Sequence, residues 1–230
     1  MKQEFANHIL DKVRDDYNET AQEFSATRQF FWPEMGKIFN FIKPENNVLD
    51  FGCGNARVLP LVLEKNGKYF GVDISQELIK IAKQKYPEEN LQVIDGVNLP
   101  FEENFFDVIY SIAVFHNVPS LELRLRILQE IKRVLRKDSF LILTVWQPKN
   151  KRFSQLFWKN NFLKILGLSK MDFRDLIEKW GNNSQRYYHL FSKKELGRMV
   201  RKSGLKIIET GTIKDPTGNR QNLYIVAKKA

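Results

Sequence analysis

Four residues between positions 50 and 73 have the types and spacing of a nucleotide-binding turn. Asp50 ends an apolar run, Gly52 and Gly54 follow it, and Asp73 ends a second apolar run about twenty residues further on. The glycines let the main chain approach a ligand without an intervening side chain. An ordinary tight strand-to-helix turn needs the glycines but not Asp73, which is placed to accept both ribose hydroxyls. The pattern therefore predicts a pocket for an adenosyl group.

Two further segments are expected to complete this pocket. An acid just past a short strand, Asp95, would accept a hydrogen bond from an adenine amino group; the alternative is a solvated turn acid. The strand after Asp107 would carry its exit residues to the same edge, where ligands of open α/β sheets bind. The predicted cofactor-binding residues are Asp50, Gly52, Gly54, Asp73, Ile74, Asp95, Gly96, Val97, Ser111 and Ile112.

Alternating strands and helices are expected to position these residues. Apolar periodicity predicts a helical arm at 2–24, a helical stretch at 30–42 broken at Pro33, and then the following elements. Strands are expected at 47–51, 68–73, 91–94, 105–111, 140–146, 205–211 and 222–228, and helices at 57–66, 76–86, 121–136 and up to Gly204. This alternation predicts an α/β fold whose parallel sheet is covered on both faces. The last two strands have no helix between them, so one must run antiparallel.

Composition limits the class of protein. With 230 residues, 43% of them hydrophobic, the chain suits one domain at 1–230, with an N-terminal arm at 1–43 and an insertion at about 147–190. No segment approaches the roughly twenty apolar residues of a membrane span, and the charged N-terminus does not resemble a leader. We expect a cytoplasmic protein without integral membrane association. The single cysteine, Cys53, excludes an internal disulfide and a cysteine-rich zinc site, and no metal is expected.

The net charge of +10 suits a polyanionic partner such as RNA, although charge alone does not decide this. Much of the basic character lies between 147 and 184, where eight basic residues face three acidic ones and aromatic residues are interleaved. The pattern predicts a substrate cap that follows an RNA backbone and stacks on bases. An amphipathic helix packed on the domain accounts for it equally well, and a peripheral contact with anionic lipids is a third interpretation.

The run Asp50-Phe-Gly-Cys-Gly54 resembles the first motif of class I S-adenosylmethionine-dependent methyltransferases, in which the acid faces the methionine end of the cofactor. Other segments resemble the tRNA wobble-uridine methyltransferases, which esterify the carboxylate of carboxymethyluridine at the first anticodon position. These segments are Phe24-Ser-Ala-Thr-Arg28 with Trp32-Pro33, Ser111-Ile-Ala-Val-Phe-His116, Leu141-Ile-Leu-Thr-Val-Trp146 and Arg186-Tyr-Tyr-His-Leu-Phe191. The resemblance implies a Rossmann-like sheet of seven strands, S-adenosyl-L-methionine as cofactor and a tRNA anticodon stem-loop as substrate. It also implies a possible small activator subunit, for which an apolar edge near Leu91 and Val93 would provide a docking place.

The chain departs from the family pattern at three places. Ala56 replaces a third glycine, Asn117 follows His116 where the family has a second histidine, and Arg136-Lys-Asp-Ser139 replaces a Lys-Pro-Gly-Gly turn. Ala56 is small enough to be tolerated, and the altered turn is expected to lie away from the site.

The reaction implied by the resemblance makes sense of the candidate acceptor residues. A carboxylate is already ionised at neutral pH and needs no general base to attack a sulfonium methyl group. Alignment and a dry site that holds the anion must then provide the catalysis. Arg28 and Arg186 are predicted to contact a carboxylate or phosphate, with His116 and His189 beside the acceptor. Surface ion pairs for the arginines, and a structural hydrogen bond for His116, are the alternatives.

The sequence therefore predicts a tRNA wobble-uridine carboxyl methyltransferase. A small-molecule O- or C-methyltransferase of the lipid or quinone type is the alternative in the same class of enzyme. A non-catalytic RNA- or partner-binding module is the alternative from another class, and failure to bind S-adenosylmethionine would favour it.

Overall fold

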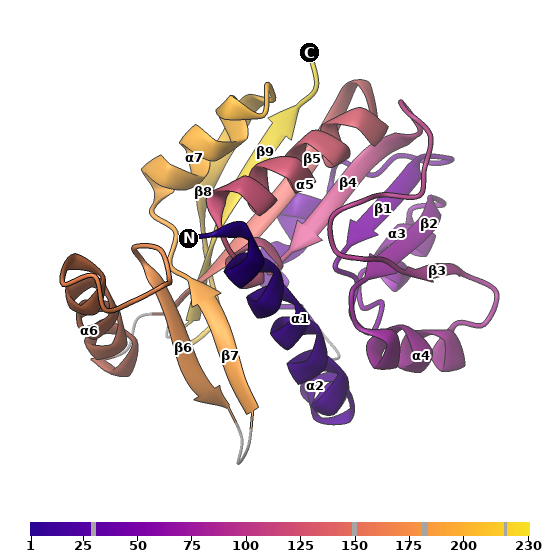
Figure 1. Ribbon diagram of the computed structural model, residues 1–230. Helices are drawn as coiled ribbons and strands as arrows, with labels where there is room; N and C mark the ends of the chain where they lie inside the picture. Colours follow the sequence, from indigo (N-terminus) through magenta and orange to yellow (C-terminus); the bar gives the residue numbers. More distant parts are fainter. Residues whose placement is uncertain (29–30, 149–150, 181–183, 219) are drawn as a thin grey trace.

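A seven-stranded sheet forms the centre of the molecule (Figure 1). The computed structural model describes residues 1–28, 31–148, 151–180, 184–218 and 220–230. The strands of the sheet are β1 (Asn47–Phe51), β2 (Lys68–Asp73), β3 (Asn90–Val93), β4 (Phe106–Ile112), β5 (Leu135–Pro148), β8 (Lys206–Lys214) and β9 (Arg220–Lys228). Their order is β3-β2-β1-β4-β5-β9-β8, and all neighbours are parallel except β9, which is antiparallel to both β5 and β8. The predicted sheet, with its one antiparallel strand, is confirmed.

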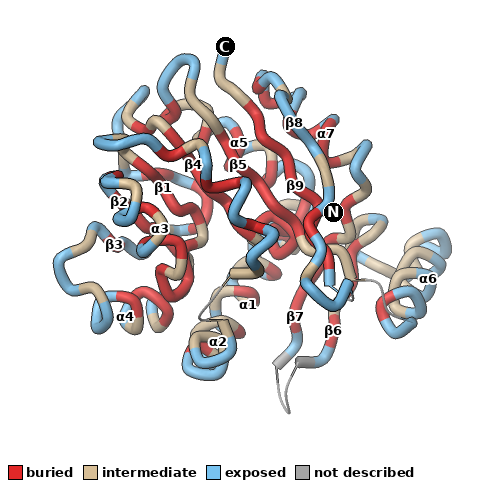
Figure 2. The backbone as a smooth tube through the Cα atoms, turned by 180° about the vertical axis from the view of Figure 1, so that it is seen from behind, coloured by how far each residue is buried: buried red, intermediate tan, exposed pale blue. Residues whose placement is uncertain are grey.

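The central strands are buried on both faces, because their apolar residues alternate between two cores. In β4, Ile109 packs into one core and Tyr110 into the other, and Leu141 and Ile142 of β5 divide in the same way. Helices α5 (Leu121–Val134) and α7 (Lys193–Lys202) contribute to the first core. The 3-10 helix η1 (Pro33–Phe39), α3 (Leu59–Glu64) and α4 (Gln76–Lys85) contribute to the second. Red strands between paler helices show this layering in Figure 2.

Two predicted helices are shorter than expected. The helix predicted at 57–66 begins only at Leu59, because Ala56 has a φ of +59° that no helix continues, and Pro60 then fits the first turn. The stretch predicted at 30–42 is a 3-10 helix from Pro33, with Gly36 in its middle weakening a regular α-helix. Phe30, where that stretch was expected to start, lies outside the described residues.

Serine side chains cap two helices at their N-termini. The Ser75 hydroxyl accepts a hydrogen bond from the amide of Leu78 at 3.2 Å. At α7, the Ser192 hydroxyl accepts from the amide of Glu195 at 3.2 Å, and the Glu195 carboxylate accepts from the amide of Ser192 at 3.4 Å. The Ser75 cap fixes where α4 begins after β2, and the Ser192 cap fixes where α7 begins after the second sheet.

The N-terminal arm is the helix pair α1 (Gln3–Glu19) and α2 (Ala21–Thr27), which lies in front of the central sheet in Figure 1. The predicted cap region contains α6 (Lys151–Ile165) and a second sheet of two antiparallel strands, β6 (Asp175–Trp180) and β7 (Ser184–His189). Sequence analysis missed this hairpin because its polar residues at alternate positions are buried. Glu178, for example, is only 9% exposed. No helix in the described part of the chain is long and apolar enough to cross a membrane.

Candidate active site

The glycine turn after β1 has the backbone conformation that its sequence predicts. Gly52 and Gly54 have φ values of +76° and +55°, a region that favours glycine. A Cβ atom on Gly52 would lie 2.3 Å from a methyl group of Val114, so only glycine fits there. Ala56, which stands where the family has a third glycine, also has a positive φ. The methyl group of Ala56 is therefore accommodated, although a positive φ disfavours residues that have a Cβ atom.

Asp73 ties this turn to the end of β2. One carboxylate oxygen accepts a hydrogen bond from the amide of Gly54 and the other from the amide of Ser75, both at 2.8 Å. The side chain is 8% exposed and lines the cavity described below. Its burial raises its pKa, while the backbone amides favour the charged form. The position of Asp73 fits a contact with ribose hydroxyls, which stays a prediction.

Asp50 is the last residue but one of β1 and is buried, with 1% of its surface exposed. One carboxylate oxygen accepts a hydrogen bond from the Tyr69 hydroxyl at 2.9 Å. Burial raises the pKa of Asp50 to about 7, although Tyr69 and the nearby charge of Arg57 oppose that shift. Burial likewise lowers the pKa of Arg57 to about 10. A ligand with a positive charge beside Asp50 would stabilise its ionised form.

A cavity of about 1000 Å³ lies at the carboxyl ends of the parallel strands. Most of the predicted cofactor residues line it: Asp50, Gly52, Gly54, Asp73, Ile74, Gly96 and Ile112. Three do not. Asp95 is exposed, and its carboxylate accepts hydrogen bonds from the amides of Val97 and Asn98 at 2.8 and 2.7 Å, as in a turn. Val97 belongs to the apolar core, and Ser111 is fully buried within β4.

Arg28 and Arg186 both line this cavity. Arg28 follows α2, and Arg186 projects from β7 with 5% of its surface exposed. The guanidinium of Arg186 lies 4.9 Å from the ring centre of Tyr17, and that of Arg28 lies 4.8 Å from the ring of Phe24. Burial, and then the charge of Arg186, lower the pKa of Arg28. Arg186 is therefore buried beside the cavity, and the partly exposed Arg28 lies near enough for the two positive charges to interact.

His116 lies beside these arginines in the 3-10 helix η2 (Phe115–Asn117), at the exit of β4. Burial, and then the charge of Arg186, lower its pKa to about 3, so the ring is neutral at physiological pH. Its Nδ1 accepts a hydrogen bond from the amide of Trp146 at 3.3 Å. The proton is therefore on Nε2, which makes that atom a donor. His116 can donate a hydrogen bond here but cannot act as a cation.

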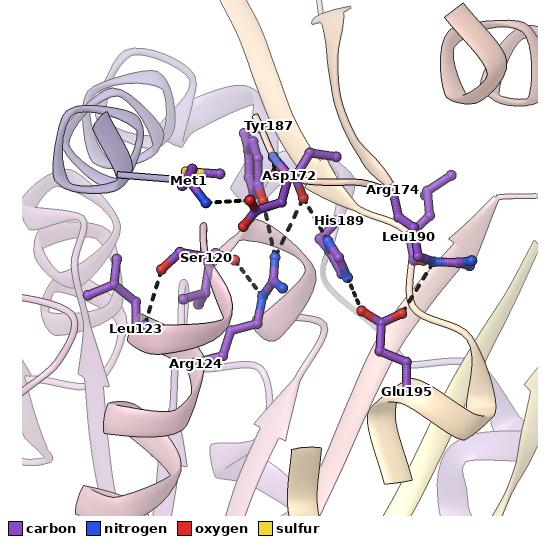
Figure 3. Close-up of polar contacts among 12 residues, drawn as sticks. Met1, Ser120, Leu123, Arg124, Asp172, Arg174, Tyr187, His189, Leu190 and Glu195 are labelled. Atoms are coloured by element: carbon purple, nitrogen blue, oxygen red, sulfur yellow. Dashed lines mark hydrogen bonds and ion pairs between the residues drawn. The ribbon is translucent and has the colours of Figure 1, made fainter. Parts of the chain in front are cut away.

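The structure does not bring His189 to this cavity. In β7 the side chains alternate, so Arg186 and Tyr188 line the cavity while Tyr187 and His189 face the opposite side. His189 lies between two carboxylates, with Nδ1 2.6 Å from Asp175 and Nε2 2.7 Å from Glu195. Figure 3 shows His189 between Glu195 and the group that contains Arg124 and Tyr187. The prediction that His189 lies beside the acceptor does not fit this position.

His189 belongs instead to a buried charged cluster that fastens the hairpin to the helices. Arg124 of α5 donates a hydrogen bond to the Tyr187 hydroxyl at 3.1 Å and lies 3.8 Å from the Asp175 carboxylate. Both ring nitrogens of His189 lie within hydrogen-bonding distance of carboxylate oxygens, so the ring links β6 to α7. The cluster therefore holds β7, and with it Arg186, in place.

Several other residues that line the cavity were not predicted as site residues: Tyr17, Arg57, Asn117, Trp146, Glu178, Arg220 and Asn222. Glu178 stands opposite Arg186 in the hairpin register and forms an ion pair with Arg152 at 3.3 Å. The period-2 alternation of 184–189 was the signal that would have separated Tyr188 from His189. Asn117 has a buried side-chain oxygen that lacks a hydrogen-bond partner among the described residues. That oxygen is available to a donor on a bound ligand.

Comparisons with known proteins agree with this geometry. A family model described as a methyltransferase domain matches residues 49–143, which contain the glycine turn. A tRNA (carboxymethyluridine(34)-5-O)-methyltransferase from Schizosaccharomyces pombe is 30% identical over 241 aligned residues, which cover 100% of both chains. The chain belongs to the tRNA carboxymethyluridine methyltransferase family.

Other members of this family differ in length and name. An Encephalitozoon cuniculi protein, named only as a methyltransferase, is 30% identical over 218 residues and 93% of both chains. An Arabidopsis thaliana tRNA (carboxymethyluridine(34)-5-O)-methyltransferase is 36% identical over 140 residues, but those residues are only 34% of its length. The present member of the family therefore matches part of the plant protein and the whole of the fission-yeast one.

Solved structures share the fold of this family. A Methanosarcina mazei S-adenosylmethionine-dependent methyltransferase superposes with a TM-score of 0.69 at 22% identity, covering 84% of this chain and 97% of its own. A Haloferax volcanii methyltransferase, solved in complex with the Trm112 methyltransferase activator, gives 0.68 at 18% identity and covers 94% and 96%. The Rossmann-like methyltransferase fold is therefore confirmed.

S-adenosylmethionine is the cofactor of this methyltransferase, and the site fits it. Gly52 and Gly54 leave the backbone open beside the cavity, Asp73 and Asp50 supply two buried acids, and the cavity of about 1000 Å³ has room for a nucleoside. The unpartnered oxygen of Asn117 adds a polar group that a ligand would satisfy. The cofactor turn and the two arginines face the same space.

Proposed function

We propose that this enzyme methylates the carboxylate of a carboxymethylated wobble uridine in tRNA, giving its methyl ester. The observation that carries this proposal is that two arginines, Arg28 and the buried Arg186, line the cofactor cavity together with a neutral His116. Such a site favours an anionic acceptor over a neutral one. The fission-yeast and plant relatives, whose names state this activity, support the same assignment.

The residues of the chain bind and orient the acceptor rather than remove a proton from it. When bound, S-adenosylmethionine supplies an electrophilic methyl group. The acceptor carboxylate is ionised at neutral pH, and no group in the cavity has to act as a base. Arg28 and Arg186 would hold it by charge-assisted hydrogen bonds, and His116 Nε2 would donate another. Holding the attacking oxygen in line, in a site with little water, provides the rate increase.

Glu178 is expected to keep Arg186 in position before the acceptor arrives. It lies opposite Arg186 in the register of β6 and β7, is 9% exposed, and has its pKa raised by burial. Arg152 binds the same carboxylate at 3.3 Å. The charges of Arg152 and then Arg186 favour the ionised form of Glu178, so its carboxylate is expected to attract the guanidinium of Arg186 toward the hairpin.

We also propose that a small activator subunit docks at the free edge of β3. Among the described strands, β3 pairs only with β2, so its outer edge presents unpaired backbone groups. Val93 on this strand is 49% exposed, whereas Leu91, which was expected to share the surface, is buried. The complex of the Haloferax volcanii relative with an activator supports this proposal. Co-purification of the two proteins, lost in Val93→Glu, would test it.

A pair of tRNA substrates tests the proposed reaction. One carries carboxymethyluridine at the wobble position, and the other is an unmodified transcript of the same sequence. With labelled S-adenosylmethionine and the activator present, we expect label in the modified tRNA only, because only it has a carboxylate. Equal labelling of both tRNAs would contradict the carboxylate assignment, and label in small molecules alone would favour the lipid or quinone alternative. A cytoplasmic location, where tRNA is available, stays a prediction.

A further inference from the structure

The outer face of α6 carries an unusual concentration of exposed apolar side chains. Ten large hydrophobic residues are exposed in the described part of the chain, and six of them lie between 158 and 173. They are Trp158, Phe162, Ile165, Leu166, Leu168 and Phe173, with 53% to 72% of each exposed. Exposed apolar groups that gather in one place mark a surface that contacts something else.

Four of these residues form one stripe along the end of α6, and Leu168 and Phe173 follow the helix. Trp158, Phe162, Ile165 and Leu166 are spaced as i, i+4, i+7 and i+8, which places them on a single face. The opposite face is already occupied: Phe153 is 3% exposed and packs against Leu176 and Tyr188. Figure 1 shows α6 at the periphery of the molecule, beside β6, and Figure 2 shows how much of it is exposed. The stripe is therefore accessible to a large, flat partner.

The charges from 151 to 171 are all of one sign, and the acid that follows, Asp172, pairs with the N-terminal amine. Residues 151–171 include five basic residues and no acidic residue. The four lysines among them are Lys151, Lys159, Lys164 and Lys170, and none forms an ion pair with another described residue. The partner must therefore be anionic as well as able to accept apolar side chains.

We propose that the outer face of α6 binds the surface of an anionic lipid membrane. A helix with tryptophan, phenylalanine and leucine on one side, lysines around them and no acids has the composition of an interfacial helix. Lysine is depleted in protein interfaces, which argues against a protein partner. Nucleic-acid interfaces are highly polar, and the exposed aliphatic groups of Ile165, Leu166 and Leu168 have no counterpart in RNA. Long lysine side chains reach the headgroups while their stems cover apolar surface.

Vesicle co-sedimentation of the full chain tests this proposal independently of the methyltransferase reaction. The probes are vesicles of phosphatidylcholine alone and of phosphatidylcholine with phosphatidylserine at about seven to three. We expect binding to the anionic vesicles to be at least about tenfold tighter than to the neutral ones, because each lysine near such a surface contributes about fivefold. Raised salt should weaken it.

Substitutions at matched positions locate the contact. Ile165→Glu should weaken binding to anionic vesicles by about tenfold or more, since it places a charge where an apolar group enters the lipid. Ile208→Glu, on β8, is the control, because Ile208 is apolar and 51% exposed but lies outside the stripe. Thermal unfolding of both variants should match the parent chain.

Three results would overturn the proposal. These are equal binding of the chain to both kinds of vesicle, unchanged vesicle binding by Ile165→Glu, and loss of tRNA binding in Ile165→Glu without any vesicle binding by the parent. The last result would assign this surface to RNA.

Discussion

Asp50→Asn is expected to make the protein more stable at alkaline pH while weakening cofactor binding. The carboxyl of Asp50 is 1% exposed, and burial raises its pKa from 3.8 to about 7. Because the folded state holds this proton more tightly than the unfolded chain, the stability of the protein falls as pH rises from about 4 to about 7. The amide of asparagine does not ionise, so the variant does not suffer that loss.

The size of the effect follows from the two pKa values. With 1.36 kcal/mol for each pKa unit, the ionisation of Asp50 costs the folded state about 2 kcal/mol at pH 5 and about 4 kcal/mol at pH 8. The difference in unfolding free energy between Asp50→Asn and the parent should therefore grow by about 2.5 kcal/mol between these pH values. Comparing two pH values cancels the constant effect of exchanging a carboxyl group for an amide.

Urea unfolding at pH 5 and pH 8, with the cofactor absent, measures this difference. Asp11→Asn, which removes an exposed carboxylate of α1, is the matched control for the loss of a surface charge. Titration calorimetry should show weaker S-adenosylmethionine binding by Asp50→Asn, since the charged form of Asp50 is the one that would meet a cationic ligand. A stability difference that is the same at both pH values would refute the reasoning about Asp50.

Three other substitutions test the remaining roles. Arg186→Lys should lower tRNA methylation at least about tenfold and leave cofactor affinity unchanged, because lysine keeps the charge but loses the planar guanidinium. Arg198→Lys, on the exposed side of α7, is its control. Full activity in Arg186→Lys would show that two-pronged binding by the guanidinium is not needed. Asp73→Asn should weaken cofactor binding about tenfold or more in calorimetry, since one side-chain oxygen cannot accept from both Gly54 and Ser75; an unaltered dissociation constant would remove Asp73 from the cofactor site. His189→Gln should lower the unfolding free energy by about 2 kcal/mol in urea, because glutamine cannot replace both hydrogen bonds of the ring, while Arg124 and Arg174 still pair with the two carboxylates. A loss under about 1 kcal/mol would show that these hydrogen bonds do not fasten the hairpin.

The cofactor half of the site could be predicted from the sequence because its signals are local. Gly52 and Gly54 reveal the turn by residue type, and Asp73 follows at the distance that one helix and one strand require. Asp95 shows the limit of that approach, since the same sequence also forms a turn that satisfies its own carboxylate. Sequence spacing alone does not separate these two outcomes.

The acceptor half depends on contacts between distant segments, and it was predicted less well. Arg28 and Arg186 are 158 positions apart in the sequence, and only folding brings them to one cavity. The residues at 184–189 match the family pattern, but side chains alternate along the strand that they form, so His189 and Arg186 point to opposite sides. Residue identity was therefore predictable there, whereas side-chain direction required the hairpin that sequence analysis missed.

Alkali treatment of the labelled tRNA product tests the central claim most directly. The enzyme, with its activator, is incubated with methyl-labelled S-adenosylmethionine and tRNA that carries carboxymethyluridine, and the nucleosides are then analysed by mass spectrometry. We predict one methyl group on the wobble uridine, released as methanol by mild alkali, because an ester hydrolyses under these conditions. A label that resists alkali, or one on any other nucleoside, would mean that the acceptor is not the carboxylate, and the account of Arg28 and Arg186 would be wrong.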